Sequence, residues 1–318
     1  MGQDDRVVKD SDEGRTGMEG ASGLSRRSFL GLAAMGGAFG LAGCRLEGGR
    51  TAGAKGSVFR LDLGACRPFS DAGAAKQAGL DYIEDGVQRF LVPDRPEADF
   101  QKMLDEAGKA ALPVRACNGF LPAQLRLTGP DVRHAEALTF AETAIRRAGA
   151  AGVPILVLGS GAARKVPEGF DSGRGREQFV QFCRALGPVA ARHRVTIVLE
   201  PLNRGETNLL NSVAEGVAVV DRVGHPHVRL LADFYHMLLE NEGPESLVLA
   251  GPRLRHCHVA EKKGRTPPGV NGDDFRPYFR ALQQTGYRGG LSLECRWTDW
   301  KVEASRAREV LRGQWNSL

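Results

Sequence analysis

Four acidic or imidazole side chains in the second half of the chain each follow a short apolar run. Glu200 follows residues 195–199, Asp233 follows 228–232, His258 follows 254–257 and Glu294 follows 290–293. Apolar runs of this length are typical of strands buried in a parallel sheet. A carboxylate that emerges from a buried strand costs free energy unless a partner offsets its charge. Carboxylate and imidazole groups together are ligands for a divalent cation, so the pattern predicts a metal site at four successive strand ends.

The segments that must position these side chains alternate between two kinds from residue 57 onward. Strands are predicted at 58–64, 82–84, 113–117, 154–159, 195–199, 228–232, 254–257 and 290–293. Helices are predicted at 71–79, 98–110, 131–148, 174–193, 211–223, 243–250, 274–285 and 301–311. Eight such units over residues 57–318 favour a (β/α)₈ TIM barrel, for which about 250 residues are typical. A doubly wound sheet would need a GxGxxG turn after its first strand, and residues 64–68 do not supply one.

The barrel interpretation makes a geometric prediction. The carboxyl ends of all barrel strands open on one face, where the active sites of such proteins are built. Glu200, Asp233, His258 and Glu294 should therefore converge, although each comes from a different strand. A single strand-end carboxylate or histidine has an ordinary structural explanation, but four on consecutive strands favour a shared site.

Composition and cysteine usage exclude several classes of protein. The chain has 318 residues, of which 42% are hydrophobic and 25% charged, and these are values of an ordinary globular protein. The net charge of +5 comes without a dense basic run, so nucleic acid is not an expected partner. The six cysteines form no CxxC pair, which argues against a zinc ribbon or a thioredoxin-like site.

The amino-terminal segment has the pattern of an export signal. Ser25-Arg26-Arg27-Ser28-Phe29 precedes a glycine-rich apolar run that is too short for a confident spanning helix. The run ends in Leu41-Ala42-Gly43-Cys44, which resembles a bacterial lipobox and predicts lipidation of Cys44. We therefore expect residues 1–44 to be a twin-arginine and lipoprotein signal segment and 45–56 a linker. A simple secretory signal or an uncleaved anchor is the alternative.

The same segment sets the expected location. The protein is predicted to leave the cytoplasm by the twin-arginine route and to reside in the periplasm or cell envelope. Its only membrane contact would be through the lipid anchor. A homo-oligomer remains open.

Four motifs resemble the sugar isomerase/epimerase superfamily with the xylose isomerase-like barrel, and among its members most closely the ketose 3-epimerases. The motifs are Glu200-Pro201-Leu202-Asn203-Arg204 with Glu206, Asp233-Phe234-Tyr235-His236-Met237, His256-Cys257-His258-Val259-Ala260-Glu261, and Leu293-Glu294. The resemblance implies one divalent ion, Mn²⁺ or Mg²⁺ with Co²⁺ or Zn²⁺ as alternatives. Its ligands would be Glu200, Asp233, His258 and Glu294. It further implies that His236 and Glu206 hold hydroxyl groups of a small carbohydrate substrate.

The implied chemistry requires these residue types. Epimerisation and aldose–ketose isomerisation both remove a proton from the carbon next to a carbonyl group. A dication stabilises the resulting enediolate, and a carboxylate on each side of the substrate can remove and return the proton. Glu200 and Glu294 resemble that catalytic pair. Two bases on opposite faces give epimerisation, whereas one base gives isomerisation.

Several other candidate residues each have more than one possible role. Asn203 and Arg265 are candidate substrate ligands, but Lys262-Lys263-Gly264 makes the register of this loop ambiguous, and a solvated basic loop is the other interpretation. Glu84, at the end of the second strand, either contacts the substrate or braces the barrel floor. His256 shares a strand face with His258 and is expected one layer deeper.

Three further functions are weighed against the isomerase or epimerase. The same metal site can serve a lyase or dehydratase acting on a keto-sugar or inositol. A phosphodiesterase of abasic-site repair needs several metal ions, and the histidine count argues against it. A barrel that binds carbohydrate without turnover is the last alternative. Because sugar phosphates are expected to be scarce outside the cytoplasmic membrane, a non-phosphorylated sugar or keto-sugar is the favoured substrate.

Overall fold

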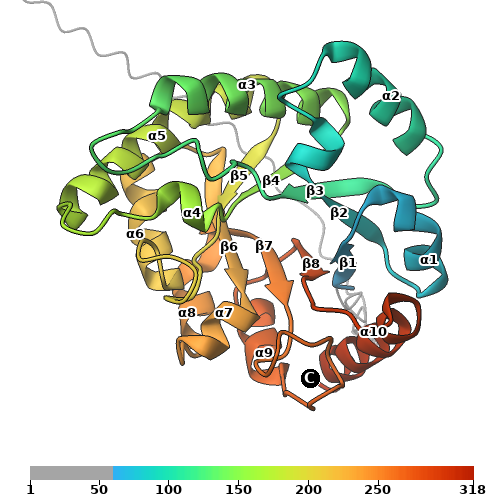
Figure 1. Ribbon diagram of the computed structural model, residues 1–318. Helices are drawn as coiled ribbons and strands as arrows, with labels where there is room; N and C mark the ends of the chain where they lie inside the picture. The colour runs from blue at the N-terminus through green and yellow to red at the C-terminus, as the bar shows by residue number, and fades with distance from the viewer. Residues whose placement is uncertain (1–59) are drawn as a thin grey trace, which may run out of the picture. The chain divides into compact units, whose positions relative to one another are not determined.

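The computed structural model describes residues 60–318, which form a closed barrel of parallel strands in the order β1 to β8 (Figure 1). The strands are β1 (Asp62–Cys66), β2 (Tyr82–Gly86), β3 (Val114–Asn118), β4 (Ile155–Leu158), β5 (Thr196–Leu199), β6 (Val228–Asp233), β7 (Leu254–Val259) and β8 (Gly290–Leu293). Closure is made by β1 and β8, whose register pairs Asp62 with Gly290 and Ala65 with Leu293. The predicted (β/α)₈ barrel is thus confirmed.

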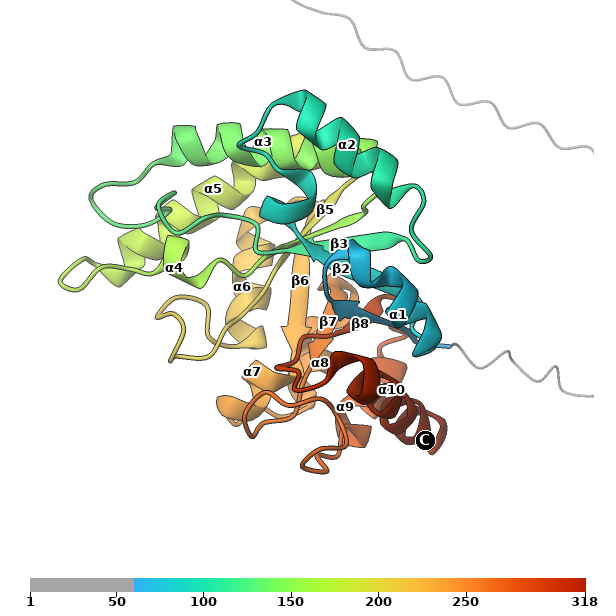
Figure 2. The ribbon, with the colours of Figure 1, turned by 45° about the vertical axis from the view of Figure 1, so that its right-hand side comes forward.

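Helices connect the strands and cover the outside of the barrel. They are α1 (Ala72–Gln77), α2 (Glu97–Ala107), α3 (His134–Ala150), α4 (Gly161–Arg164), α5 (Ser172–Arg192), α6 (Val213–Val223), α7 (Phe234–Leu239), α8 (Glu245–Ala250), α9 (Arg276–Gln284) and α10 (Trp300–Asn316). Short helical turns are η1 (Phe69–Asp71), η2 (Val87–Leu91) and η3 (Gly251–Arg253). The last helix, α10, lies beside α1 and so covers the closure of the barrel (Figures 1 and 2). Across residues 60–318, every helix is too short or too polar to cross a bilayer.

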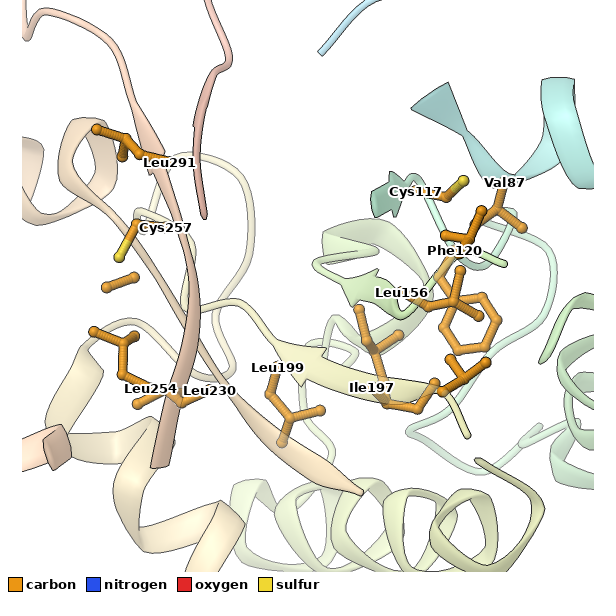
Figure 3. Close-up of a cluster of buried hydrophobic side chains, with 14 of the residues drawn as sticks. Val87, Cys117, Phe120, Leu156, Ile197, Leu199, Leu230, Leu254, Cys257 and Leu291 are labelled. Atoms are coloured by element: carbon orange, nitrogen blue, oxygen red, sulfur yellow. The ribbon is translucent and has the colours of Figure 1, made fainter. Parts of the chain in front are cut away.

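The strands separate two apolar layers of different size. The outer layer lies between strands and helices and includes Ile197, Leu230, Cys257 and Leu291, which Figure 3 labels. The inner layer inside the barrel consists of Val157, Val198 and Leu231, with Ile155 packed against it. Because successive side chains of a strand face opposite sides, this partition directs the strand-end ligands toward the barrel axis.

Tyr82 fills part of the barrel interior that the small inner layer leaves open. Its side chain is buried, and its hydroxyl lies 2.9 Å from Ser292 Oγ. A methyl group at Gly64 or Gly290 would overlap the Tyr82 side chain, so both glycines make room for it. The amino-terminal half of the barrel is therefore packed around one aromatic residue.

The predicted bounds of the strands and helices agree with the structure in the middle of the chain, and the predicted start of the first strand is wrong. The first strand was expected at 58–64, but β1 spans Asp62–Cys66 because its ladder with β8 begins only at Asp62. The short helices α4 and α7 and the helical turns η2 and η3 were not predicted. The predicted signal segment 1–44 with its Cys44, the whole linker 45–56 and residues 58–59 of the predicted first strand lie outside the described residues.

Candidate metal centre

The four predicted ligands meet at the carboxyl end of the barrel. Asp233 is the last residue of β6, His258 lies near the end of β7, and Glu200 and Glu294 directly follow β5 and β8. One ligand atom from each of these four residues lies within 4.8 Å of all the others. Asp233, His258 and Glu200 are almost completely buried, and the Glu294 side chain is 26% exposed. Of the four side chains, that of Glu294 is the one solvent reaches most.

His258 is oriented by carboxylates on both sides of its ring. Its Nδ1 lies 3.1 Å from Glu200 Oε1 and 3.0 Å from Glu294 Oε2, whereas its Nε2 lies 2.9 Å from Glu84 Oε1. An ionised Glu84 carboxylate accepts hydrogen bonds but cannot donate them. The His258 Nε2 that faces it must therefore carry a proton. Nδ1 then faces the four-residue cluster, where it donates to the carboxylates when the ring is charged and offers its lone pair when the ring is neutral. A carboxylate behind a ligating histidine is the usual arrangement at protein metal sites.

The charges of the cluster fit a dication. Three carboxylates share a buried space with His258 and with one guanidinium, that of Arg265. Burial raises the pKa of Glu200. Burial also opposes ionisation of Glu294, but the charges of His258 and Arg265 prevail and hold its pKa below the ordinary value. Three oxygen donors and one imidazole nitrogen at this spacing match the donor set of Mn²⁺ or Mg²⁺ sites.

Arg265 lies inside the site, which resolves the ambiguity of its loop. Its Nη2 lies 3.2 Å from Asp233 Oδ2 and contacts Glu294 Oε2, and its Nε donates to the Glu294 carbonyl at 3.0 Å. The guanidinium stacks 4.7 Å from the ring centroid of Tyr235. Burial opposes the charge of Arg265, but Glu294 and Asp233 raise its pKa. The neighbouring Lys262 and Lys263 are exposed, as the alternative interpretation expected of this loop.

Glu261 folds the loop that delivers Arg265. Its buried carboxylate accepts hydrogen bonds from the backbone N–H groups of Gly269 at 2.7 Å and Gly272 at 2.9 Å. It also accepts from Asn271 N and Thr266 Oγ1. Burial works against the charge of Glu261, but these donors lower its pKa. Hydrogen bonds to one ionised side chain therefore hold the conformation of this loop.

Among residues 60–318, His236 presents a buried donor that has no hydrogen-bond partner. It lies on α7, which begins directly after Asp233, and the Tyr235 N–H donates to Asp233 Oδ1 at 2.9 Å. The His236 Nδ1 accepts from the backbone N–H of Asn203 at 3.2 Å, so its Nε2 carries the proton. That Nε2 is buried without a hydrogen bond and lies 3.4 Å from Asp233 Oδ2. An unpartnered buried N–H beside the cluster is placed to bind a substrate hydroxyl.

Asn203 and Glu206 extend this group of side chains. The Asn203 amide nitrogen donates to Glu206 Oε1 at 3.0 Å and lies 2.9 Å from His236 Nδ1. Glu206 is half exposed, and its Oε1 lies 3.9 Å from Arg265 Nη1. The Asn203 side chain thus contacts two protein groups and fixes their positions. The Glu206 carboxylate remains partly exposed to solvent.

Glu84 braces the barrel floor, which was one of its two predicted roles. Its Oε2 lies 2.7 Å from His256 Nε2 and accepts from Ser292 Oγ at 2.7 Å, and its Oε1 contacts His258. Both carboxylate oxygens are therefore engaged within the barrel. These contacts agree with the bracing role, and the substrate contact of Glu84 stays a prediction. His256 lies in the deeper layer, as expected.

Arg164 and Gly159 set the position of Glu200. The fully buried Arg164 donates to the Glu200 carbonyl at 2.7 Å and to the Leu158 carbonyl at 3.2 Å, which joins the ends of β4 and β5. Burial lowers the pKa of Arg164 to about 10. A methyl group at Gly159 would overlap Glu200 Oε2. A side chain at this turn would therefore displace the Glu200 carboxylate from its position.

Two residues near the cluster were not predicted. Asn118, the last residue of β3, donates to Glu294 Oε1 at 3.3 Å. Cys66, the last residue of β1, has its sulfur within 4.8 Å of ligand atoms of His258 and Glu294. Both occupy the same strand-end position as the predicted ligands, which was the available signal for them. Asn118 orients a carboxylate that the rest of the cluster leaves partly exposed.

Comparison with protein families identifies the class. The family model described as the xylose isomerase-like TIM barrel matches residues 72–314. The chain therefore belongs to this family. The L-ribulose 3-epimerase of Mesorhizobium japonicum is 30% identical over 229 residues, which cover 69% of this chain and 72% of that protein.

Two further proteins are similar to this chain, one over a shorter segment and one in fold. The L-ribulose 3-epimerase of Methylomonas sp. is 38% identical over 124 residues, which cover 39% of this chain but only 43% of that protein. The chain thus spans less than half the length of that curated relative. A D-psicose 3-epimerase from Clostridium cellulolyticum H10, crystallised with D-tagatose, superposes with a TM-score of 0.71 over 80% of this chain and 99% of that one. At 22% identity this likeness shows the fold alone.

Loading with a divalent metal should stabilise the protein through this cluster. An ion present at 100 times its Kd adds about 2.7 kcal/mol to the free energy of unfolding, or roughly 5–10 °C in Tm for a domain of this size. We expect Mn²⁺ to raise the Tm of the chelator-treated protein, and His258→Ala to weaken Mn²⁺ binding about 10-fold or more. Calorimetric unfolding and titration measure both effects. His193→Ala is the matched control, and equal Mn²⁺ affinity in the two variants would contradict the assignment.

Proposed function

We propose that this chain is a divalent-metal-dependent sugar epimerase or isomerase that acts on a non-phosphorylated sugar or keto-sugar. The observation that carries the proposal is the convergence of Glu200, Asp233, His258 and Glu294 within 4.8 Å at the carboxyl mouth of the barrel. These residues would hold Mn²⁺ or Mg²⁺. When bound, the ion acts as a Lewis acid that stabilises the negative charge developing on the carbonyl oxygen of the substrate.

Glu200 and Glu294 are the proposed proton-transfer pair. They follow β5 and β8, which are separated by two strands of the closed barrel, and so approach the opening from different directions. One carboxylate removes the proton from the carbon next to the carbonyl group, and the other returns a proton to the opposite face. The electron pair left by the first step resides in an enediolate, which collapses to the epimeric sugar on reprotonation.

The remaining polar groups bind and orient the sugar. The unpartnered Nε2–H of His236 donates to a hydroxyl, and the half-exposed carboxylate of Glu206 accepts from another. Arg265 supplies a positive charge beside Glu294 and closes one wall of the site with Tyr235. Asn203 holds His236 and Glu206 in register, so its contribution to substrate binding is indirect.

The substrate class follows from two supports. Relatives of this chain are named for L-ribulose, which is a free ketose. The predicted export signal would deliver the protein to a compartment where sugar phosphates are scarce. Both supports favour a free sugar or keto-sugar over a phosphorylated one.

Replacing the carboxylate of Glu294 tests the chemistry. Glu294→Gln should abolish exchange of the acidic C–H proton in D₂O, because the amide cannot accept that proton, while the fold remains intact. The assay is a panel of free ketoses and keto-sugars incubated with the Mn²⁺-loaded protein, scored by deuterium incorporation and by product analysis. Glu136→Gln, an exposed carboxylate on α3, is the control.

The outcomes of this assay separate the candidate reactions. Deuterium in a product of unchanged carbon skeleton supports epimerisation or isomerisation, whereas loss of water or of another leaving group would identify a lyase. Wild-type exchange in Glu294→Gln would show that this residue is not the base. Turnover of phosphorylated substrates alone would overturn the proposed substrate class.

We further propose that the protein is exported by the twin-arginine route and anchored through lipidated Cys44. The support is the sequence pattern of Ser25–Phe29 and of Leu41–Cys44. Twin-arginine export carries folded proteins, which suits an enzyme that takes up its metal before it leaves the cytoplasm.

Metabolic labelling with a fatty-acid analogue tests the anchor. The full-length chain should incorporate the label. Cys44→Ala should not, because the proposed acyl attachment requires the Cys44 thiol. Absence of label on the unmodified chain, or label that survives Cys44→Ala, would refute lipidation at this position.

A further inference from the structure

Cys66 places a sulfur donor at the carboxyl mouth of the barrel that the proposed reaction does not use. It is the last residue of β1, and its sulfur and one ligand atom each of His258 and Glu294 all lie within 4.8 Å of one another. These three residues form a second possible metal-binding group beside the one that contains Glu200 and Asp233. The two groups share His258 and Glu294 and differ in the chemistry of their other donors.

The alternation of side chains along β1 directs Cys66 toward the barrel axis. Ala65 belongs to the apolar layer between strands and helices, so its neighbours Gly64 and Cys66 face the interior. A methyl group at Gly64 would overlap the ring of Tyr82, which agrees with this orientation because Tyr82 fills part of the barrel interior. In the ladder with β2, Cys66 pairs with Glu84, which braces the metal centre from below. The sulfur therefore lies in the same interior space as the metal ligands.

With Cys66, the run of donor side chains extends over five neighbouring strands. Because β1 lies next to β8 in the closed barrel, the ends of β5, β6, β7, β8 and β1 carry two carboxylates, an imidazole, a carboxylate and a thiol in that order. Glu200 and Asp233 lie on one side of the shared pair, and Cys66 lies on the other. A cation held by His258 and Glu294 can thus take its remaining protein donors from either side.

The Cys66 thiol is free and partly exposed. Among residues 60–318, three cysteines are buried and two, Cys66 and Cys295, are partly exposed free thiols. The Cys295 thiol donates to the Val259 carbonyl at 3.5 Å and belongs to none of the possible metal-binding groups in the described part of the chain. Cys66 is therefore the thiol that an ion entering from solvent can reach beside other ligands.

The kind of donor selects the kind of cation. Carboxylate oxygens suit hard ions such as Mg²⁺ and Mn²⁺, whereas a thiolate favours softer ions such as Zn²⁺. Zinc binds sulfur at about 2.3 Å and nitrogen or oxygen at about 2.0–2.2 Å, so two donors of one ion lie at most about 4.5 Å apart. The donor atoms of Cys66, His258 and Glu294 lie within 4.8 Å of one another, so small side-chain movements bring all three to one ion.

We propose that Cys66 binds a thiophilic divalent cation, such as Zn²⁺ or Cd²⁺, together with His258 and Glu294. A hard cation, Mn²⁺ or Mg²⁺, uses the same pair with Glu200 and Asp233 instead. The thiol releases its proton to solvent when the sulfur binds the cation, and no electron is transferred. Cys66 thus widens the range of ions that the centre holds. The proposal rests on the metal centre of the proposed function, and its test separates the two.

Cadmium is the probe, because a thiolate bound to Cd²⁺ gives a strong ultraviolet charge-transfer band that carboxylate and imidazole ligands do not give. The chelator-treated full-length chain carrying Cys44→Ala is titrated with Cd²⁺, and we expect a saturable band and a calorimetric Kd. Cys66→Ala in this background should lose the band and bind Cd²⁺ about 10-fold or more weakly. Cys66→Ser, which keeps the size of the side chain, should do the same. Cys295→Ala, the matched partly exposed thiol, should leave both unchanged.

Mn²⁺ titration of the same proteins separates this proposal from the proposed function. Cys66→Ala and Cys66→Ser should keep the Mn²⁺ affinity of their parent chain, which also shows that the oxygen donors are in place in the variants. Normal Mn²⁺ binding without a cadmium–thiolate band, or a band that survives both Cys66 substitutions, would overturn the sulfur site and leave the proposed function standing. A parent chain that binds neither ion would overturn both.

Discussion

The crowding of three carboxylates around His258 is the constraint on which the rest of the structure depends. Glu200, Asp233 and Glu294 emerge from three different strands into one largely buried space, where their mutual repulsion opposes folding. Arg265 offsets part of this charge and a dication would offset the rest. The barrel is closed by β1 and β8, so the strand ends cannot move apart to relieve the repulsion.

The supports around the cluster are mostly hydrogen-bonded rather than apolar. Arg164 ties the end of β5 to β4 through two carbonyl groups, Glu261 folds the loop of Arg265, and Glu84 selects the tautomer of His258. Each support is itself buried. Buried polar groups that are held by several hydrogen bonds restrict a site to one geometry, which is the property that proton transfer at a defined carbon atom requires.

The sequence was sufficient for the fold and for the four-residue cluster because both follow from periodicity. Apolar runs predicted the strands, and the side chain after each run predicted the ligand, since barrel topology brings strand ends together. His236 was predicted as a site residue, but the six-residue helix α7 that presents it was not, because a helix of one and a half turns leaves little periodic signal. The start of β1 was predicted too early because the apolar Leu61 directly precedes the strand and extends its sequence pattern.

The orientation of individual side chains could not be predicted from the sequence. Glu84 had two open roles, and the sequence could not foresee its contacts with His256, Ser292 and His258. Arg265 required the fold of a loop that depends on one buried carboxylate, Glu261. Asn118 and Cys66 share the strand-end position of the ligands, yet amide and thiol side chains are too common at such positions to be singled out.

The most direct test of the account is the position of a bound ion. Crystals of the Mn²⁺-loaded protein measured at the manganese absorption edge should show an anomalous peak between Glu200, Asp233, His258 Nδ1 and Glu294, with bonds of about 2.0–2.3 Å. Such a peak would establish the centre from which the proposed chemistry follows. A loaded protein whose peak lies elsewhere, or whose four side chains surround only water, would contradict it.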